Sequence, residues 1–194
     1  MKTSRALPTV LLLAALVWCA PIAPAKLEQF LIDPGAETTR IRFESKATLE
    51  SFTGETRQAE GSLWLDPDAL SDSITMVVTV DLATLDTGIG LRNDHMRNNH
   101  LHTDRYPEAV FRGAHLLGEI PARLAPGETV RLEVAGRLDL HGIERPVRMQ
   151  AQVRREQHEG RTRLWLQGRF DVKLSDFAIP RPKFLMLKVS DTQK

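Results

Sequence analysis

The stretch TGIGLRNDHMRNNHLHTDRYP, residues 87–107, interrupts a chain that otherwise alternates apolar and polar residues. Inside it the apolar residues thin out to Ile89, Leu91, Met96 and Leu101, a spacing that fits a short helix better than a strand. Tyr106-Pro107 returns the chain to an extended conformation, because the residue before a proline avoids the helical region. We therefore predict one short helix near residues 90–103, packed as a plug or lid on one end of a β structure.

Both flanks of this helix carry strand patterns. In Ser73–Leu82, apolar residues alternate with polar ones, and the same alternation recurs in segments 40–47, 61–65, 130–140, 147–153 and 164–172, while 30–33 and 109–117 are also extended. Phe52-Thr-Gly54 and Ala125-Pro-Gly-Glu128 are predicted turns. Strands with one apolar and one charged face favour an all-β, antiparallel barrel of about eight strands, with a two-sheet sandwich as the alternative.

Residues 1–25 are predicted to be a secretory signal peptide. A short positive start is followed by the apolar run Leu7–Ala20 and by the cleavage site Ala23-Pro-Ala25. Cys19 does not predict a lipid anchor, because Trp18 is too large for the residue before a lipidated cysteine. The mature chain, residues 26–194, then has 169 of the 194 residues and no cysteine, which fits a single periplasmic domain held by its core.

The charge balance excludes two classes of partner at this stage. Without the leader's Lys2 and Arg5, 24 of the 26 basic residues remain against 25 acidic ones, and the sequence shows no strong excess of either sign in one place. Nucleic acid and an anionic membrane surface are therefore expected to be poor partners.

The inward face of the strands decides whether the barrel is filled or hollow. Small residues fall in phase with the large apolar ones, at Gly136, Ala151 and Gly168. They either leave space for a ligand or let strands bend and pack closely, and the pattern alone does not choose between these. The predicted lining of a hollow interior is Ile41, Phe43, Ile74, Met76, Val78, Val80, Val134, Gly136, Met149, Leu164, Leu166, Gly168 and Phe170.

Three segments resemble the YceI-like family. Gly136-Arg-Leu-Asp-Leu-His-Gly-Ile-Glu-Arg-Pro-Val147 is similar to the family motif G-x-L-T-L-H-G-V-T-K-P-V, and Ser175-Asp-Phe-Ala-Ile179 resembles its late S-D-F-G-I. The opening stretch matches a second motif, at Thr87, Arg92, His95, Arg97, Tyr106 and Pro107. Asn93 and Asn98 depart from it, standing where the family usually has Asp and Ser, as do His100 and His102, which replace an acidic and an apolar residue.

This resemblance implies a periplasmic, lipocalin-like barrel that binds a polyisoprenoid, such as an isoprenoid lipid or an isoprenoid quinone. Storage or transport of that lipid, with transient contact to a membrane that donates it, is the predicted function; no enzymatic activity and no cofactor are implied. Arg92 and Arg97 are candidates for contacting the head group at the barrel mouth, although arginines on such a helix more often cover the rim.

Two other functions stay open. His95, His100 and His102 suggest a metal-dependent hydrolase, but their spacing places no two of them at the i, i+4 positions typical of ligands on one helix face. Asp139 and His141 alternate onto one strand face, yet no G-x-S-x-G motif and no mature cysteine accompanies them, so His141-Gly142 is interpreted as a turn. A ligand-free structural or interaction barrel is the third class.

The resemblance also implies one more strand after Val189-Ser-Asp191, where this sequence stops at Lys194. Either segment 184–190 closes the barrel, or an open edge recruits a second copy as a homodimer. In the second case a chain extended by one amphipathic strand is expected to be more stable and to retain lipid better.

Overall fold

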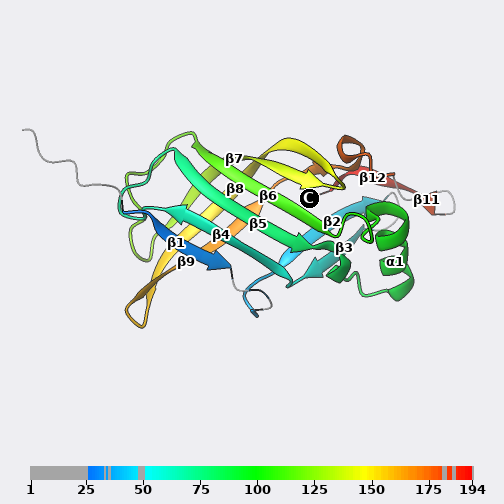
Figure 1. Cartoon of the computed structure of the whole chain (residues 1–194), viewed down its shortest axis with the longest axis horizontal. Helices are drawn as coiled ribbons and strands as arrows, with labels where there is room; N and C mark the ends of the chain where they lie inside the picture. Colours follow the sequence, from blue (N-terminus) through cyan, green and yellow to red (C-terminus); the bar gives the residue numbers. More distant parts are fainter. Residues whose placement is uncertain are drawn as a thin grey trace, which may run out of the picture.

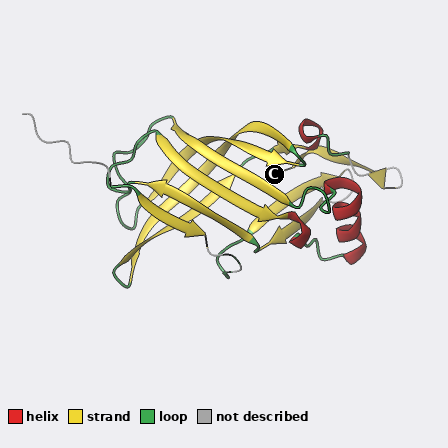
Figure 2. Cartoon of the chain, viewed as in Figure 1, coloured by secondary structure: helices red, strands yellow, loops and turns green. Residues whose placement is uncertain are grey.

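The computed structural model describes residues 26–32, 34, 36–47, 51–180, 183–184 and 187–193, and for residues 46–47, 183–184 and 187–193 it describes the backbone only. Strands dominate the fold (Figure 2). They are β1 (Glu28–Ile32), β2 (Ile41–Ala47), β3 (Ser51–Thr56), β4 (Ala59–Leu65), β5 (Ser73–Asp81), β6 (Glu108–Leu117), β7 (Thr129–Leu140), β8 (Ile143–His158), β9 (Arg161–Arg169), β10 (Val172–Lys173), β11 (Lys183–Phe184) and β12 (Leu187–Gln193). The helical elements are η1 (Leu82–Thr84), α1 (Gly90–His95), η2 (Met96–Leu101) and η3 (Leu174–Phe177).

The strands form a near-closed antiparallel barrel (Figure 1). Seven of them pair in the order β1-β4-β5-β6-β7-β8-β9, and a second sheet has the order β10-β12-β2-β3, with β11 on β12. The chain passes between the sheets twice without a long connection, from β3 into β4 and from β9 into β10. The predicted all-β, antiparallel class is confirmed.

Strand β12 lies where a closing strand is needed, because it pairs antiparallel with both β10 and β2. The outer strands of the larger sheet, β1 and β9, pair with β4 and β8 respectively and not with each other. The predicted signal peptide, residues 1–25, and the side chains of segment 184–190 lie outside the described residues, so export and the apolar face of that segment stay predictions. The comparison with an extended chain stays a prediction.

One end of the barrel is sealed by its loops. Between β4 and β5 and between β6 and β7, Pro67 and Leu124 are fully buried, and the Leu124 N–H donates to the Pro67 carbonyl over 2.8 Å. Arg155 reaches this plug from β8, donating to the Leu124 carbonyl and pairing with Asp68. The cavity of the barrel therefore does not continue through this end.

The helix crosses the opposite end of the barrel (Figure 1). It runs through α1 and the wider π-type turns of η2, and it ends at His102, whose φ of 48° is left-handed. Met96 and Leu101 pack against the core, whereas Ile89 and Leu91 are 51% and 63% exposed. The predicted helix is confirmed, and among the described residues no helix combines the length and apolar character that a membrane span requires.

One turn prediction was wrong. Phe52-Thr-Gly54 lies inside β3, where Phe43 pairs with Gly54 and Ser45 with Phe52. The glycine is there for close packing: a Cβ on Gly54 would lie 2.2 Å from Cε1 of the Phe43 ring. Phe52 in turn packs edge-on against Phe43, with ring centroids 6.1 Å apart. In the sequence this glycine indicated a turn, whereas in the structure it makes room for the Phe43 ring inside the strand.

Candidate functional site

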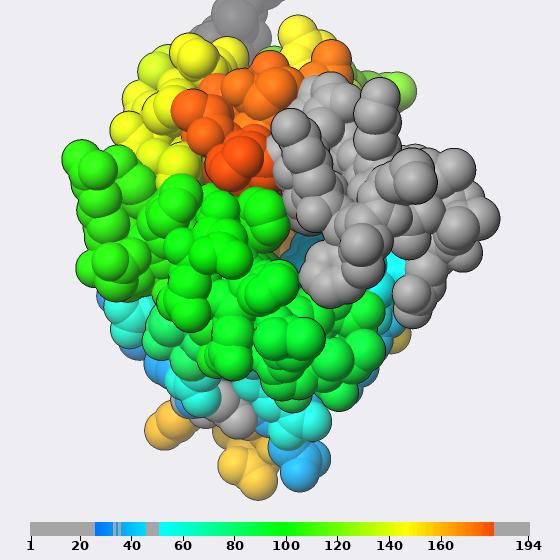
Figure 3. Space-filling view, turned by 90° about the vertical axis from the view of Figure 1, so that its right-hand side faces the viewer, coloured from blue at the N-terminus to red at the C-terminus, as the bar shows by residue number. Residues whose placement is uncertain are grey.

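The barrel encloses an open cavity of about 2110 Å³. That is more than twice the roughly 300–1,000 Å³ of a typical small-molecule pocket, which favours a long ligand. The wall is mostly apolar and comes from the strands, from the helix, and from the segment after η3. Seen from the helix end, the surface is hollowed beside the helical segment (Figure 3).

Most of the predicted lining residues lie on this wall. They come from β2, β5, β8, β9, the residue after β9 and the helix: Ile41, Phe43, Met76, Val78, Val80, Met149, Leu164, Leu166, Gly168, Phe170 and Arg92. Ile74 and Val134 face inward as expected, but they are packed into the core and do not border the cavity. The strand period predicts which side a residue faces and does not predict whether its neighbours cover it.

Gly136 and Arg97 also lie away from the wall. A Cβ on Gly136 would lie 2.4 Å from the Arg112 carbonyl oxygen and 2.8 Å from the Phe111 ring, so this glycine admits a neighbouring ring. Arg97 points its Nη2 at the carbonyl of Leu85, 3.0 Å away. Gly136 therefore does not border the cavity as predicted, and contact of Arg97 with a head group stays a prediction.

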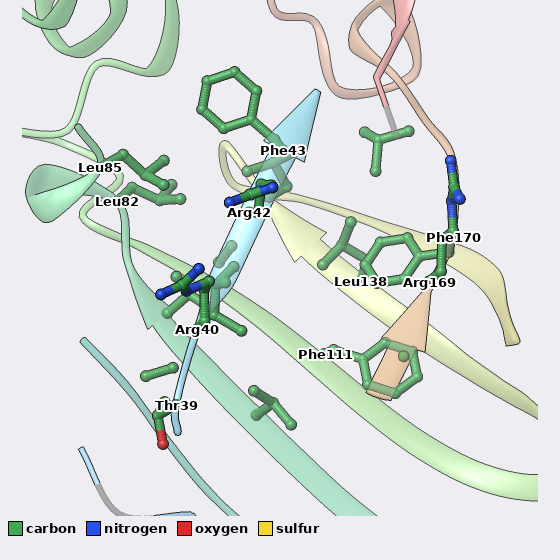
Figure 4. Close-up of a pocket in the computed structure, with 18 of the residues that line it drawn as sticks. Thr39, Arg40, Arg42, Phe43, Leu82, Leu85, Phe111, Leu138, Arg169 and Phe170 are labelled. Atoms are coloured by element: carbon green, nitrogen blue, oxygen red, sulfur yellow. The ribbon is translucent and has the colours of Figure 1, made fainter. Parts of the chain in front are cut away.

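Several wall residues were missed. Phe111 and Leu138 stand across from Phe43 in the close-up of the cavity (Figure 4), and Phe111 stacks on Phe170 with ring centroids 5.9 Å apart. Leu82 and Leu85 also border the space. Alternation along β7 could have placed Leu138 on the inward face, and alternation continued from β5 could have placed Leu82 there. Nothing in the sequence indicates where Leu85, just after η1, turns.

A polar network fastens the helix beside the cavity. The buried Asn93 side chain accepts from the N–H and hydroxyl of Thr87 and donates to Asp86 over 2.7 Å. The Asp86 carboxylate accepts from the Asn93 amide and from the Gly88 N–H. These two hydrogen bonds, the one from Asn93 first, hold the pKa of Asp86 below its usual range. The Asp86 backbone pairs with Glu55 of β3 in both directions. The asparagine that departs from the family motif therefore ties the helix to the sheet.

Arg92 is held in the same network. It donates from Nε to the Thr87 hydroxyl over 2.9 Å and from Nη2 to the Thr87 carbonyl over 2.7 Å. Its guanidinium also lies over the Phe52 ring, 4.6 Å from the centroid. Arg92 therefore borders the cavity while two of its nitrogen atoms, Nε and Nη2, already donate to Thr87.

The histidines separate into different environments. His102 Nδ1 lies 2.9 Å from Nε2 of His141, whose Nδ1 is 3.0 Å from the Phe177 carbonyl oxygen. His141 and Gly142 form the tight β7–β8 turn with φ of 55° and 72°, so the turn interpretation is confirmed. His100 contacts the Pro180 carbonyl instead. Among the described residues no group of three His, Cys, Asp or Glu side chains is arranged to hold a metal ion.

His100, on the cavity wall, is expected to make the stability of the fold depend on pH. Removal from water lowers the pKa of His100, the Pro180 carbonyl acts in the opposite direction, and His95 and His102 lower it further. The unfolded chain, with an ordinary histidine pKa of about 6.5, then binds more protons than the folded chain. The contribution of His100 to the free energy of unfolding is therefore expected to be fully present above about pH 6.5. It should be lost as the pH falls through the lowered pKa of the folded state.

The measurement is the urea midpoint between mildly alkaline and mildly acidic pH. The His100→Gln variant should show a smaller loss of midpoint on acidification than the wild type. His158→Gln, at an exposed position of the β8–β9 hairpin, is the matched control and should keep the full loss. An unchanged slope in His100→Gln would contradict the assignment.

Charges on the wall have one sign. Arg40, Arg42, Arg92, Arg163 and Arg169 border the cavity with His95 and His100, and no described Asp or Glu does. Arg40 and Arg42 lie on one side of the space and Arg169 on the other (Figure 4). Of these arginines, Arg42 is paired with Glu55, at 3.1 Å. A nearly neutral chain therefore has a cationic rim around an apolar cavity.

Comparison with known proteins agrees with this architecture. A UPF0312 protein of Vibrio parahaemolyticus is 26% identical over 160 residues, 80% of each chain, and one of Photorhabdus laumondii is 29% identical over 127 residues, 64% of this chain and 61% of the relative. BcnA of Burkholderia cenocepacia has a similar fold, with a TM-score of 0.60 at 20% identity, covering 79% of this chain and 90% of BcnA. A polyisoprenoid binding domain from Saccharophagus degradans, implicated in plant cell wall breakdown, has a TM-score of 0.56 at 21% identity, covering 85% and 88%.

The family is established by a sequence match, because the structural similarities, at 20% and 21% identity, show only that the fold is shared. The model of the YceI-like domain matches residues 30–194, which takes in every strand from β2 onward and the helix. The motifs at the helix and at the β7–β8 turn fall inside this range and hold the structural positions described above. The chain is a member of the YceI-like domain family.

Proposed function

We propose that this protein binds a long-chain polyisoprenoid lipid in the barrel cavity and stores or carries it without chemical change. The observation that carries the proposal is the size of the cavity, about 2110 Å³, together with its apolar wall. The similar fold of a polyisoprenoid binding domain from Saccharophagus degradans supports the same ligand class. The signal peptide predicted at residues 1–25 supports a periplasmic location.

The energetics suit a carrier. Burial of hydrocarbon is worth roughly 0.8 kcal/mol per CH₂ group taken from water. For a tail of tens of carbons this sum exceeds the practical ceiling of about 20 kcal/mol, so ordering and desolvation must offset much of it. A lipid that starts in a bilayer gains less, because it leaves one apolar phase for another. Reversible exchange with a membrane follows.

Native mass spectrometry of the protein purified from its own periplasm tests the proposal. The expected result is a mass increase equal to one isoprenoid lipid, identified after organic extraction as a quinone, phosphate or alcohol. A bound metal ion would favour the hydrolase alternative. A bare mass, together with no uptake of added ubiquinone or polyprenyl phosphate from detergent, would favour a structural barrel and contradict the proposal.

A further inference from the structure

The cavity reaches the protein surface along the two outer strands of the larger sheet, where the exposed Leu31 of β1 and Trp165 of β9 border it, and this part of the cavity is called the opening below. Strands β1 and β9 both contribute to its wall, and neither is hydrogen-bonded to the other. An edge strand that is left unpaired is usually covered or protected by charge. Here both edges border the barrel cavity.

Basic side chains gather at this opening. Arg163 and Arg169 of β9 and Arg40, immediately before β2, are exposed and border the cavity. None of the three forms an ion pair with a described residue, unlike Arg42, which is paired with Glu55. Glu156 of β8 lies opposite Arg163 in the strand register, and its carboxylate pairs with Arg154.

Exposed apolar side chains accompany them. On β9, Leu164 and Leu166 pack against the core, so alternation turns Trp165 outward, and it is 42% exposed. Leu31 of β1 is 72% exposed and borders the same opening. Tryptophan and arginine together are typical of surfaces that meet a membrane interface, where the ring sits at head-group level and cations meet phosphates.

We propose that Leu31, Arg40, Arg163, Trp165 and Arg169, here called the edge surface, dock the protein on an anionic lipid bilayer. The three arginines meet lipid phosphates, and Trp165 and Leu31 enter the interfacial layer. This proposal differs from the expectation that an anionic membrane surface is a poor partner, which relied on the distribution of charge along the chain. Delivery of lipid through the opening rests on the proposed function, whereas docking itself does not.

Vesicle flotation of the leaderless protein tests the docking. The vesicles are phosphatidylcholine alone or with about 30 mol % phosphatidylglycerol, and both lack any polyisoprenoid. The wild type should float with the anionic vesicles and not with the neutral ones, and added salt should release it. The triple variant Arg40→Gln, Arg163→Gln, Arg169→Gln should bind the anionic vesicles at least about tenfold more weakly.

The matched control removes three positive charges from positions outside the edge surface. Arg57, Arg112 and Arg131 are exposed, form no ion pair with a described residue and lie outside the cavity wall. Their replacement by Gln should leave flotation unchanged. Equal loss in both triple variants, no loss in either, equal binding to neutral vesicles or no binding at all would overturn the proposal.

A second readout keeps the test valid if the triple variant misfolds. The mature chain has two tryptophans, Trp64 and Trp165, so Trp64→Phe leaves a single reporter on the edge surface. Its fluorescence should shift to the blue on anionic vesicles and be quenched by brominated lipids. Absence of quenching would overturn the docking. Because no polyisoprenoid is present, docking without lipid uptake in the earlier assay would refute the proposed function alone.

Discussion

Ala109→Trp is expected to fold like the wild type and to bind a polyisoprenoid more than tenfold more weakly. Ala109 lies on β6, pairs with Val80 and borders the cavity, so an indole there occupies space that the lipid tail needs. Displacing only two CH₂ groups of the tail costs about 1.6 kcal/mol. That is slightly more than a tenfold increase in Kd.

The matched control is Ala114→Trp, an exposed alanine on the same strand. It adds the same ring outside the cavity and should bind the lipid like the wild type. Binding is measured by titration of a fluorescent polyisoprenoid analogue, with folding checked by circular dichroism. Equal affinity of the two folded variants would place the ligand somewhere other than this cavity.

Much of the barrel could be predicted from one sequence because its strands have a period of two. In β5, Ile74, Met76 and Val80 face inward and are buried, as the alternation indicated. The period cannot distinguish a residue in a packed layer from one facing empty space. Ile74 and Val80 have the same phase and similar exposure, yet Val80 alone borders the cavity.

The polar part of the site was harder to predict, because it depends on contacts between distant segments. Arg163 and Arg40 are far apart in the sequence and border one opening only because β1 and β9 remain unpaired with each other. His102 and His141 come within hydrogen-bonding distance because the helix ends where the β7–β8 turn begins. The spacing of the histidines along the helix argued against a metal site, but it could not identify the groups that they contact.

Glycines show the same limit, and they allow the sharpest stability prediction. Gly136 and Gly168 were equivalent in the sequence, both mid-strand and in phase with large apolar residues. In the structure, a Cβ at Gly136 meets the backbone carbonyl of Arg112 at 2.4 Å, whereas a Cβ at Gly168 meets the Met149 sulfur at 2.3 Å. A backbone atom in a paired strand cannot move alone, while a methionine side chain can swing into the adjacent cavity.

Gly136→Ala is therefore expected to lower the free energy of unfolding by about 2–3 kcal/mol, as overpacking against a fixed neighbour does. Gly168→Ala should lower it by less than about 1 kcal/mol, because repacking of Met149 relieves the contact and alanine reduces the entropy of the unfolded chain. Urea unfolding of both variants, followed by circular dichroism, measures the difference. Equal midpoints would mean that β6 and β7 can separate at Gly113 and Gly136 without loss of stability, and that the close packing of Phe111 over these glycines contributes little.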